Sequence, residues 1–201
     1  MLSPTIETER LILRRYKETD IDAIYEIITD ERLTYYISYP PFTKEKELEC
    51  IKKWIEEADT NKKEKWVMEL KSTKEIVGNI DVNTINEKNN YCNVGYTIRY
   101  AYWGNGYATE AVEALVDYMF CTVGVQRLCA RIVTSNLTSV RLATRLNMEC
   151  DGLLRKGVYL KDKAHDVYVY SITDTDYVRI LKSKEQASEE SCQQAENEVE
   201  E

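Results

Sequence analysis

Two glycines stand two residues apart in the segment Tyr102-Trp-Gly-Asn-Gly-Tyr-Ala-Thr109, between an alternating apolar stretch and an amphipathic one. Glycine lets the backbone close around a phosphate where a Cβ would block the approach. The N–H groups of a first helical turn have no partner inside the helix, and the helix dipole attracts an anion to them. The segment therefore predicts a pyrophosphate site that needs no lysine, with a tight turn of purely steric origin as the alternative.

Two common nucleotide-binding motifs do not match this segment. A P-loop requires Gly-Lys-Ser or Gly-Lys-Thr, which is missing here. The dinucleotide fingerprint requires Gly or Ala three residues after Gly106, where Thr109 stands. The fingerprint also opens a run of parallel βαβ units, whereas the preceding segments have the pattern of hairpin strands. The phosphate interpretation remains, but a simple mononucleotide or dinucleotide fits it poorly.

The charge of the chain is unevenly distributed. The formal net charge is −8, and residues 185–201 hold seven glutamates and no basic residue. The rest of the chain is therefore close to neutral. A nucleic-acid-binding surface needs a basic stripe, so this distribution argues against a nucleic-acid partner.

Cysteine spacing and the first residues bear on the compartment. Six cysteines are present without a CxxC pair, and His165 is the one histidine. A zinc site gathers several such ligands, so no metal is expected. The first ten residues carry acids and a proline, unlike a signal peptide, and no apolar run approaches a membrane span. We expect a cytoplasmic protein with reduced thiols and no membrane partner.

Hydrophobic periodicity predicts the elements that position the glycine-containing turn. Strands show alternation of period two, and helices show apolar residues three and four apart. Asp20 and Thr43 stand where they can cap the first two helices. The expected order is strand 10–16, helices 20–28 and 43–58, strands 65–70, 76–82 and 91–100, helix 106–121, strand 127–133, helix 136–146, and strands 148–159 and 167–174.

This order of elements predicts an α/β (α+β) domain around one mixed, mostly antiparallel sheet. Residues 1–181 hold every expected strand and helix, and a chain of 201 residues suits a single domain. Residues 182–201 are rich in Glu, Gln and Ser and lack aromatic side chains. Such a composition cannot bury enough apolar surface to fold, so we expect an acidic disordered tail.

Two segments on these elements carry a family resemblance. The stretch Tyr102-Trp-Gly-Asn-Gly-Tyr-Ala-Thr-Glu-Ala111 and the later Asn136-Leu-Thr-Ser139 are similar to motifs of the GNAT acetyltransferase superfamily. Within that superfamily the chain resembles the RimJ/RimL type, named for ribosomal-protein N-acetyltransferases. The resemblance covers residues 7–173, nearly the whole expected domain. It implies a single GNAT domain whose strand at residues 95–100 splays from the following strand.

The resemblance implies acetyl-CoA as co-substrate, lying in the slot that the splayed strand opens. The pantetheine arm is expected to pair with main-chain groups of Ile98, Arg99 and Tyr100. The pyrophosphate is expected on the main-chain amides of Trp103, Gly104, Asn105, Gly106, Tyr107, Ala108 and Thr109. Asn136 would cap its helix and also reach the coenzyme arm.

The resemblance also assigns a proton donor. Ser139 matches the serine that this branch places near the thioester sulfur. Ala143 occupies the position where many other GNAT enzymes have a tyrosine that acts as the acid. Ser139 is therefore the expected donor, and a solvent-facing helical serine is the alternative.

The general base stays open at this point. Asn93 stands where the branch often has a glutamate, and an amide cannot take a proton. Asp166 matches an acidic residue common in the last strands of the branch, with a structural hydrogen-bond acceptor as the alternative. Strand alternation predicts that His165 faces the opposite side from Asp166. The other candidates are Asp151, Glu149 and a water chain.

These assignments predict an acetyl-CoA-dependent N-acetyltransferase acting on a primary amine, with the α-amine of a protein or peptide preferred. Alternatives are an acetyltransferase for a small amine (polyamine, aminoglycoside or amino acid) and a non-catalytic CoA-binding module. A homodimer is left open. The acceptor site is expected among the side chains of Tyr35, Tyr36, Tyr39 and Tyr159.

Overall fold

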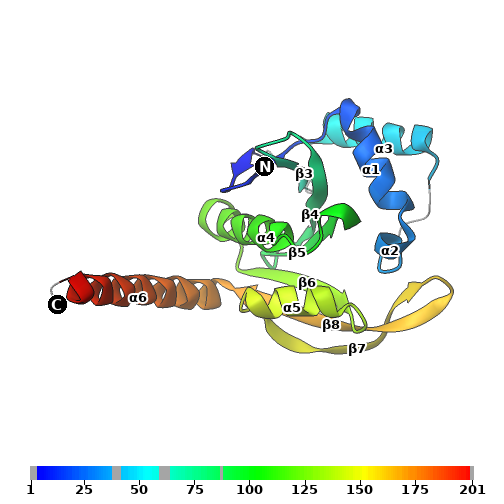
Figure 1. Ribbon diagram of the computed structural model, residues 1–201. Helices are drawn as coiled ribbons and strands as arrows, with labels where there is room; N and C mark the ends of the chain where they lie inside the picture. The colour runs from blue at the N-terminus through cyan, green and yellow to red at the C-terminus, as the bar shows by residue number, and fades with distance from the viewer. Residues whose placement is uncertain (1–3, 38–41, 59–63, 87, 200–201) are drawn as a thin grey trace.

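The computed structural model describes residues 4–37, 42–58, 64–86 and 88–199, and these residues form one eight-stranded sheet flanked by helices (Figure 1). The strands lie in the order β1-β2-β3-β4-β5-β6-β8-β7. Their bounds are β1 Ile6–Glu7, β2 Leu11–Arg14, β3 Glu64–Leu70, β4 Ile76–Asn86, β5 Tyr91–Ile98, β6 Arg127–Val133, β7 Glu149–Leu160 and β8 Lys163–Thr173. The predicted Tyr39 lies outside the described residues.

Six α-helices accompany the sheet in the described part of the chain. A π-helical stretch Tyr118–Val123 continues α4, and short 3-10 turns Glu18–Asp20 and Tyr100–Tyr102 precede α1 and α4. Among the described residues, no helix combines the length and the apolar character needed to cross a membrane. The helices are α1 Ile21–Thr29, α2 Glu31–Thr34, α3 Lys44–Glu57, α4 Tyr107–Asp117, α5 Leu137–Arg145 and α6 Asp174–Val199.

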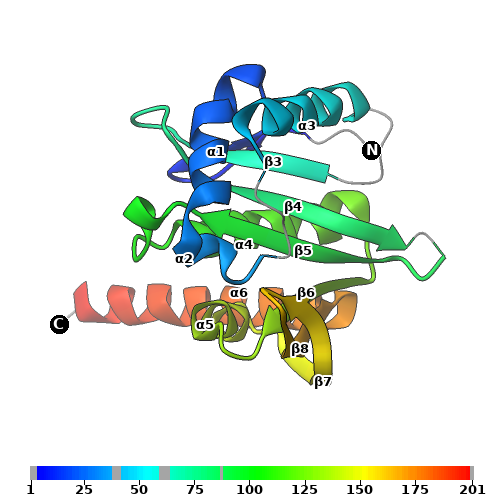
Figure 2. The same cartoon turned by 90° about the vertical axis from the view of Figure 1, so that its right-hand side faces the viewer.

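The sheet is continuous at one end of β5 and divided at the other. Neighbouring strands are antiparallel except β5 and β6, which are parallel and pair only from Tyr91–Arg127 to Asn93–Cys129. Beyond Asn93, β5 continues to Ile98 beside β4 without a partner on β6. Figure 2 shows β6, β7 and β8 turned away from β3, β4 and β5. The predicted splayed, mostly antiparallel sheet is confirmed.

Two apolar clusters hold the helices on the two faces of the sheet. Val112 of α4 and Leu142 of α5 join the larger cluster with Trp66 of β3. Ile51 of α3 joins the smaller cluster with Val67, the next residue of β3, together with side chains of α1. Successive side chains of a strand point to opposite faces. The helices α4 and α5 therefore cover one face, and α1 and α3 cover the other. Figure 2 shows α1 and α3 in front of β3 and β4, with α4 behind.

The predicted helix caps have different outcomes. Thr43 accepts a hydrogen bond from the Lys46 amide at 3.3 Å and caps α3, as predicted. The predicted cap of α1 by Asp20 is wrong, because its side chain makes no capping hydrogen bond to that helix. Asp20 is instead buried, and its two carboxylate oxygens lie 2.9 Å from the Arg14 guanidinium. The Asp20 carboxylate therefore binds Arg14 in a buried ion pair and does not cap the helix.

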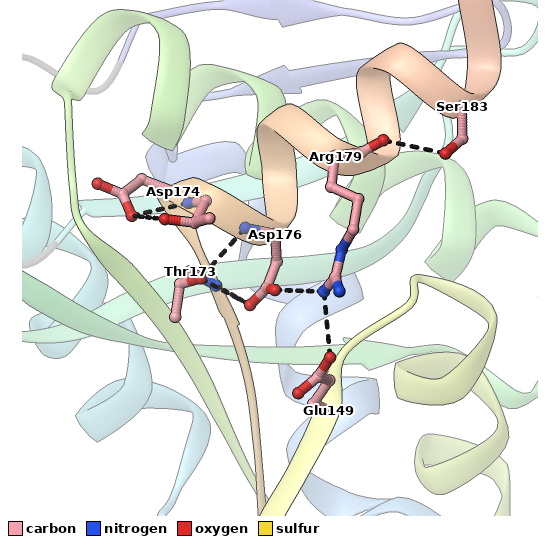
Figure 3. Close-up of polar contacts among 7 residues, drawn as sticks. Glu149, Thr173, Asp174, Asp176, Arg179 and Ser183 are labelled. Atoms are coloured by element: carbon pink, nitrogen blue, oxygen red, sulfur yellow. Dashed lines mark hydrogen bonds and ion pairs between the residues drawn. The ribbon is translucent and has the colours of Figure 1, made fainter. Parts of the chain in front are cut away.

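Helix α6 runs to Val199, through residues for which composition predicts an acidic tail. Its start is capped reciprocally: Thr173 donates to the Asp176 carboxylate at 2.6 Å, and the Asp176 amide donates to Thr173 Oγ1 at 3.2 Å. Arg179 binds Asp176 and also Glu149 of β7, which fixes the first turns to the sheet (Figure 3). Residues such as Glu, Gln and Ala favour a helix even where no core is available to bury them.

Candidate active site

The glycine-containing turn has the conformation that its sequence predicts. Gly104 and Gly106 have φ angles of 80° and 81°, in the left-handed region that favours glycine. Helix α4 begins directly after Gly106, and its first i to i−4 bond runs from the Glu110 amide to the Gly106 carbonyl at 3.1 Å. The preceding helical amides, those of Tyr107, Ala108 and Thr109, therefore lack intrahelical acceptors.

The N-terminal strand region holds this turn through Glu110 of α4. The Glu110 carboxylate accepts hydrogen bonds from Thr8 Oγ1 at 2.5 Å, from the Arg10 amide at 2.7 Å and from Arg10 Nε at 2.7 Å. Arg10 Nη1 also donates to the Asn105 carbonyl at 2.9 Å. We call Thr8, Arg10 and Glu110 the loop clamp. It was missed from sequence because Glu110 lies about one hundred residues from Thr8 and Arg10.

The loop clamp fixes the direction of one peptide unit. In a trans peptide the carbonyl and the following N–H point in opposite directions. Since Arg10 holds the Asn105 carbonyl, the Gly106 N–H points away from Arg10. Burial opposes ionisation of Glu110, but the hydrogen bonds from Thr8 and Arg10 outweigh it and lower its pKa. The carboxylate therefore stays charged and neutralises Arg10.

The edge of β5 beyond Asn93 presents main-chain groups to the space between β5 and β6. The Arg99 amide donates to the Val77 carbonyl of β4 at 2.8 Å. Main-chain groups of adjacent strand residues point to opposite edges, so the Ile98 groups point away from β4. The Ile98 carbonyl accepts a hydrogen bond from Trp103 Nε1 at 2.8 Å. Of the main-chain groups expected to bind pantetheine here, the Arg99 amide has another partner and the Ile98 amide has the required direction.

Some main-chain amides of the glycine-containing turn also have an acceptor within the protein already. The Trp103 amide donates to the Tyr100 carbonyl at 3.1 Å, within the 3-10 turn. The Asn105 side chain binds the carbonyls of Tyr102 and Trp103 at 3.1 and 3.2 Å, which stiffens the turn from inside. The Trp103 amide is therefore not available to an anion, and the expected anion site excludes the first of residues 103–109.

Ser139 lies in a pair of hydroxyl groups. Tyr96 of β5 donates a hydrogen bond to Ser139 Oγ of α5 at 3.0 Å, across the division between β5 and β6. Asn136 caps α5 by accepting from the Ser139 amide at 3.2 Å, as predicted. Burial raises the pKa of the Tyr96 phenol, and the hydrogen bond with Ser139 offsets part of that rise. Tyr96 was missed, although alternation along 91–98 places it on the inward face with Cys92.

The three acids considered as general base each bind another group. Asp166 accepts a hydrogen bond from the Lys156 amide at 2.7 Å, within an irregular part of the β7–β8 pair. Asp151 pairs with Arg127 at 2.6 Å, and Glu149 pairs with Arg179 at 3.1 Å. Among the described residues, Asp166 and Ser139 share no hydrogen bond. This geometry favours the structural alternative for Asp166.

Aromatic side chains gather near the end of β6. The Tyr36 hydroxyl donates to the Ser135 carbonyl at 3.3 Å, and its ring lies edge-on to Tyr35 at 4.9 Å. The Tyr35 ring in turn contacts the His165 ring at 6.3 Å. Helix α2 and its following turn therefore reach across to β8 at this point. Tyr159, also expected here, is 66% exposed.

The described residues thus form an α/β fold in which the sheet divides beside the N-terminus of α4 and the Tyr96–Ser139 hydroxyl pair bridges the division. A family model described as "Acetyltransferase (GNAT) domain" matches residues 10–149. The chain belongs to the GNAT acetyltransferase family.

Individual relatives agree with this assignment over nearly the whole domain. "Uncharacterized N-acetyltransferase p20" of Bacillus licheniformis is 30% identical over 174 residues, which are 86% of this chain and 98% of that protein. A GNAT-family acetyltransferase from Bacillus anthracis has a similar structure, with a TM-score of 0.77, 24% identity, and coverage of 86% and 99%. RimL, a ribosomal L7/L12 alpha-N-protein acetyltransferase solved with coenzyme A, has a TM-score of 0.77 at 19% identity, with coverage of 85% and 98%.

Proposed function

We propose that this protein transfers the acetyl group of acetyl-CoA to the α-amine of a peptide or protein N-terminus. The observation that carries the proposal is the Tyr96–Ser139 hydroxyl pair. It spans the division between β5 and β6, the strand edge that leads to the glycine turn. The start of α4 offers an anion site, β5 beyond Asn93 offers an open strand edge, and Ser139 offers a proton donor beside that edge. That sequence of groups suits a thioester attached to a long phosphorylated arm.

The residues of the turn fit the coenzyme. A Cβ built on Gly104 meets no atom within 4 Å, and the left-handed φ angle is the reason for glycine there. The amides of Gly106, Tyr107, Ala108 and Thr109 would hold the pyrophosphate. The Ile98 amide would pair with the pantetheine arm, and Asn136 would approach it from α5. The coenzyme supplies an acetyl group activated as a thioester.

Acetyl transfer needs three contributions: stabilisation of an oxyanion, protonation of the departing thiolate and deprotonation of the amine. A fixed main-chain N–H on β5 stabilises the oxyanion that forms when the amine attacks the thioester carbonyl. The departing thiolate has a pKa of about 8.5 by analogy with cysteine, so protonation by Ser139 helps only moderately. An α-amine, with a pKa of about 8, loses its proton at neutral pH more easily than a lysine amine at about 10.4.

A peptide acceptor is preferred over a small amine because an α-amine loses its proton more easily at neutral pH. The structurally similar RimL is also named as an alpha-N-protein acetyltransferase. The aromatic side chains of Tyr35, Tyr36 and His165 gather beside Ser135, past the end of β6, and suit a cationic amine. A polyamine, aminoglycoside or amino acid is the second candidate. A cytoplasmic location and a homodimer stay predictions.

The test is release of free thiol from acetyl-CoA with a panel of peptide N-termini, polyamines, aminoglycosides and amino acids. We expect turnover with peptides and a roughly tenfold lower kcat for Ser139→Ala, because a hydroxyl donor assists a moderately basic leaving group. Faster turnover with a small amine than with any peptide would replace the peptide by that amine. Binding of acetyl-CoA without thiol release on any amine would contradict a transferase.

A further inference from the structure

The proton that leaves the acceptor amine needs a nearby acceptor, and Asn93 cannot provide one. Glu149, Asp151 and Asp166 each bind a different group, as described above. Along its whole length β5 is paired with β4, and Asn83 of β4 lies opposite Asn93. The register of β4 therefore decides which acid can replace the missing carboxylate.

Asp81 occupies the required position on β4. Asn83 is the Cα partner of Asn93, and Asp81 is the Cα partner of Gly95. Cross-strand partners present their side chains on the same face of the sheet. Asp81 therefore shares a face with Asn93 and stands one pair farther along β5, past the last β5–β6 pair at Asn93. The Asn83 amide donates a hydrogen bond to the Asp81 carboxylate.

The absence of a side chain at Gly95 leaves space that the Asp81 carboxyl group fills. A Cβ at Gly95 would lie 3.2 Å from Asp81 Oδ1 and 3.6 Å from both Cγ and Oδ2. The carboxyl group thus lies over β5 at Gly95, where β5 is no longer paired with β6. This contact explains, on steric grounds, why a glycine occupies that position of the strand.

The charged residue on the other side of Asp81 is Lys65, its Cα partner on β3. Lys65 Nζ lies over the Trp54 ring of α3, 4.4 Å from the centroid. The ammonium group is therefore directed to the helix layer, while the Asp81 carboxyl group is directed to β5. The Asp81 carboxyl group therefore lies on the face of the sheet near Gly95, next to the slot.

We propose that Asp81 binds the ammonium group of the acceptor and relays its proton to water, in place of a glutamate at position 93. This inference rests on the proposed transferase function. The ammonium passes one proton through the carboxylate, and the neutral amine forms an N–C bond with the thioester carbonyl carbon. The C–S bond then breaks, the thiolate takes a proton from Ser139, and the second amine proton replaces the one that Ser139 gave. The products are the amide, the free thiol and one proton in solvent.

The test compares Asp81→Asn with the wild type at two pH values, using the peptide α-amine that the wild type acetylates fastest. At about pH 7 we expect kcat/KM to fall about 100-fold, because a positioned base contributes on that order. At about pH 9.5 the deficit should shrink below about tenfold, because an α-amine with a pKa of about 8 has already lost its proton. A variant with a merely structural defect would keep the same deficit at both pH values.

Three further variants define the role. Asp81→Glu keeps a carboxylate and should recover part of the rate. Gly95→Ala keeps Asp81 but displaces its carboxyl group, since the new Cβ would stand 3.2 Å from Oδ1, and should slow transfer. Asp162→Asn makes the same chemical change in the exposed β7–β8 turn and should match the wild type. The dissociation constant for acetyl-CoA, measured by calorimetry, should be unchanged in Asp81→Asn.

The outcomes separate this inference from the function on which it rests. Wild-type turnover together with an Asp81→Asn rate within about threefold at neutral pH would overturn the role of Asp81 and leave the transferase intact. A deficit that does not change between the two pH values would also overturn it. No thiol release by the wild type on any amine would overturn the transferase function and the reaction in which Asp81 acts.

Discussion

At the scale of single residues, the direction of one hydrogen bond determines what Ser139 can do. Tyr96 donates to Ser139 Oγ, so the serine proton is free to point at another acceptor. Burial raises the pKa of the Tyr96 phenol, which keeps the phenol protonated and its donor role constant. A thiolate that forms beside Ser139 would receive the serine proton while Tyr96 stabilises the resulting oxygen. The two hydroxyl groups then act as one relay.

Tyr96→Phe tests this relay, because it removes the hydroxyl and keeps the ring that packs on α5. We expect kcat to fall about threefold to tenfold with little change in KM for acetyl-CoA, since one neutral hydrogen bond is worth about 0.5–1.5 kcal/mol. Steady-state thiol release measures both constants. Tyr168→Phe, which removes a hydroxyl on β8, serves as the control. An unchanged kcat in Tyr96→Phe, with a reduced kcat in Ser139→Ala, would assign Tyr96 to packing alone.

Sequence reasoning succeeds at residues whose role depends on local backbone and fails where the partner is distant. Asn136 caps α5, as expected from local rules, and Asn147 takes a φ of 57° at the end of that helix, a conformation that Asn adopts more readily than most residues. Tyr96 and Asp81 depend on contacts with α5 and β5 that no local pattern contains. Neither could be assigned before the register of the strands was known.

At the scale of elements, the start of α4 is positioned from outside its own segment. A helix N-terminus attracts an anion only where its amides point in a common direction. The loop clamp joins the turn between β1 and β2 to α4, so the orientation of the glycine turn depends on the N-terminal strands. Arg10 also lies over the Tyr107 ring, 4.7 Å from its centroid, which places it beside the first residue of the helix.

Glu110→Gln and Arg10→Ala should both weaken acetyl-CoA binding. We expect KM for acetyl-CoA to rise about tenfold, an effect of about 1.4 kcal/mol, while KM for the amine stays the same. Calorimetric titration with coenzyme A checks binding without turnover. Lys71→Ala removes a nearby ion pair with Glu7 that does not touch the glycine turn and should leave KM unchanged. A KM for acetyl-CoA within about twofold of wild type in both clamp variants would contradict the positioning role.

The loop clamp also predicts the direction of a pH effect. The folded pKa of Glu110 is lowered, so its stabilising contribution is complete above the unfolded carboxyl value of about 4.3 and is lost as pH falls through the lower folded value. Coenzyme affinity should therefore be insensitive to this group at neutral pH. Glu110→Gln should remove the acid-side loss of affinity, which titrations between about pH 3 and 6 would detect.

Element boundaries show what periodicity can predict. The strand at 127–133 and the helix ending near 146 agree with β6 and α5. The four-residue helix α2 was missed, because a single turn is too short to show helical periodicity. Strand β4 continues to Asn86, four residues past its expected end, since pairing with β5 extends a polar stretch that would otherwise form a turn.

At the scale of the whole molecule, residue patterns predicted a mixed antiparallel sheet, while the splay came only from the family resemblance. No pattern along β5 marks where its pairing with β6 ends, because the N–H and C=O groups of Val94 and later residues are the same in paired and unpaired strands. The separation depends on how α4, α5 and the β7–β8 pair pack, which is a property of the complete fold. The tail is predicted from composition alone, and it stays a prediction, while α6 spans residues 182–199 of it.

A buried acid links the stability of this fold to pH. Glu64 of β3 is 1% exposed, and its carboxylate oxygens have no hydrogen-bond partner in the part of the chain that the structure describes. Desolvation raises its pKa, and the nearby phenol of Tyr118 has its own pKa raised to about 12 by burial and by Glu64. Above about pH 4.3 the unfolded chain releases the Glu64 proton more readily than the folded chain. Stability should therefore fall as pH rises from that value through the folded pKa.

Glu64→Gln removes the ionisation and keeps the shape of the side chain. At about pH 7 we expect it to raise the free energy of unfolding by about 1 kcal/mol, or Tm by about 2–4 °C, because the folded protein no longer pays the desolvation cost of a buried carboxylate. Thermal unfolding followed by circular dichroism across pH 4 to 8 measures the effect, with the exposed Glu56→Gln as the control. The variant should show the smaller fall in Tm with rising pH. Parallel Tm curves for variant and wild type would mean that Glu64 titrates in the folded protein as it does in the unfolded chain, which contradicts its burial as the cause.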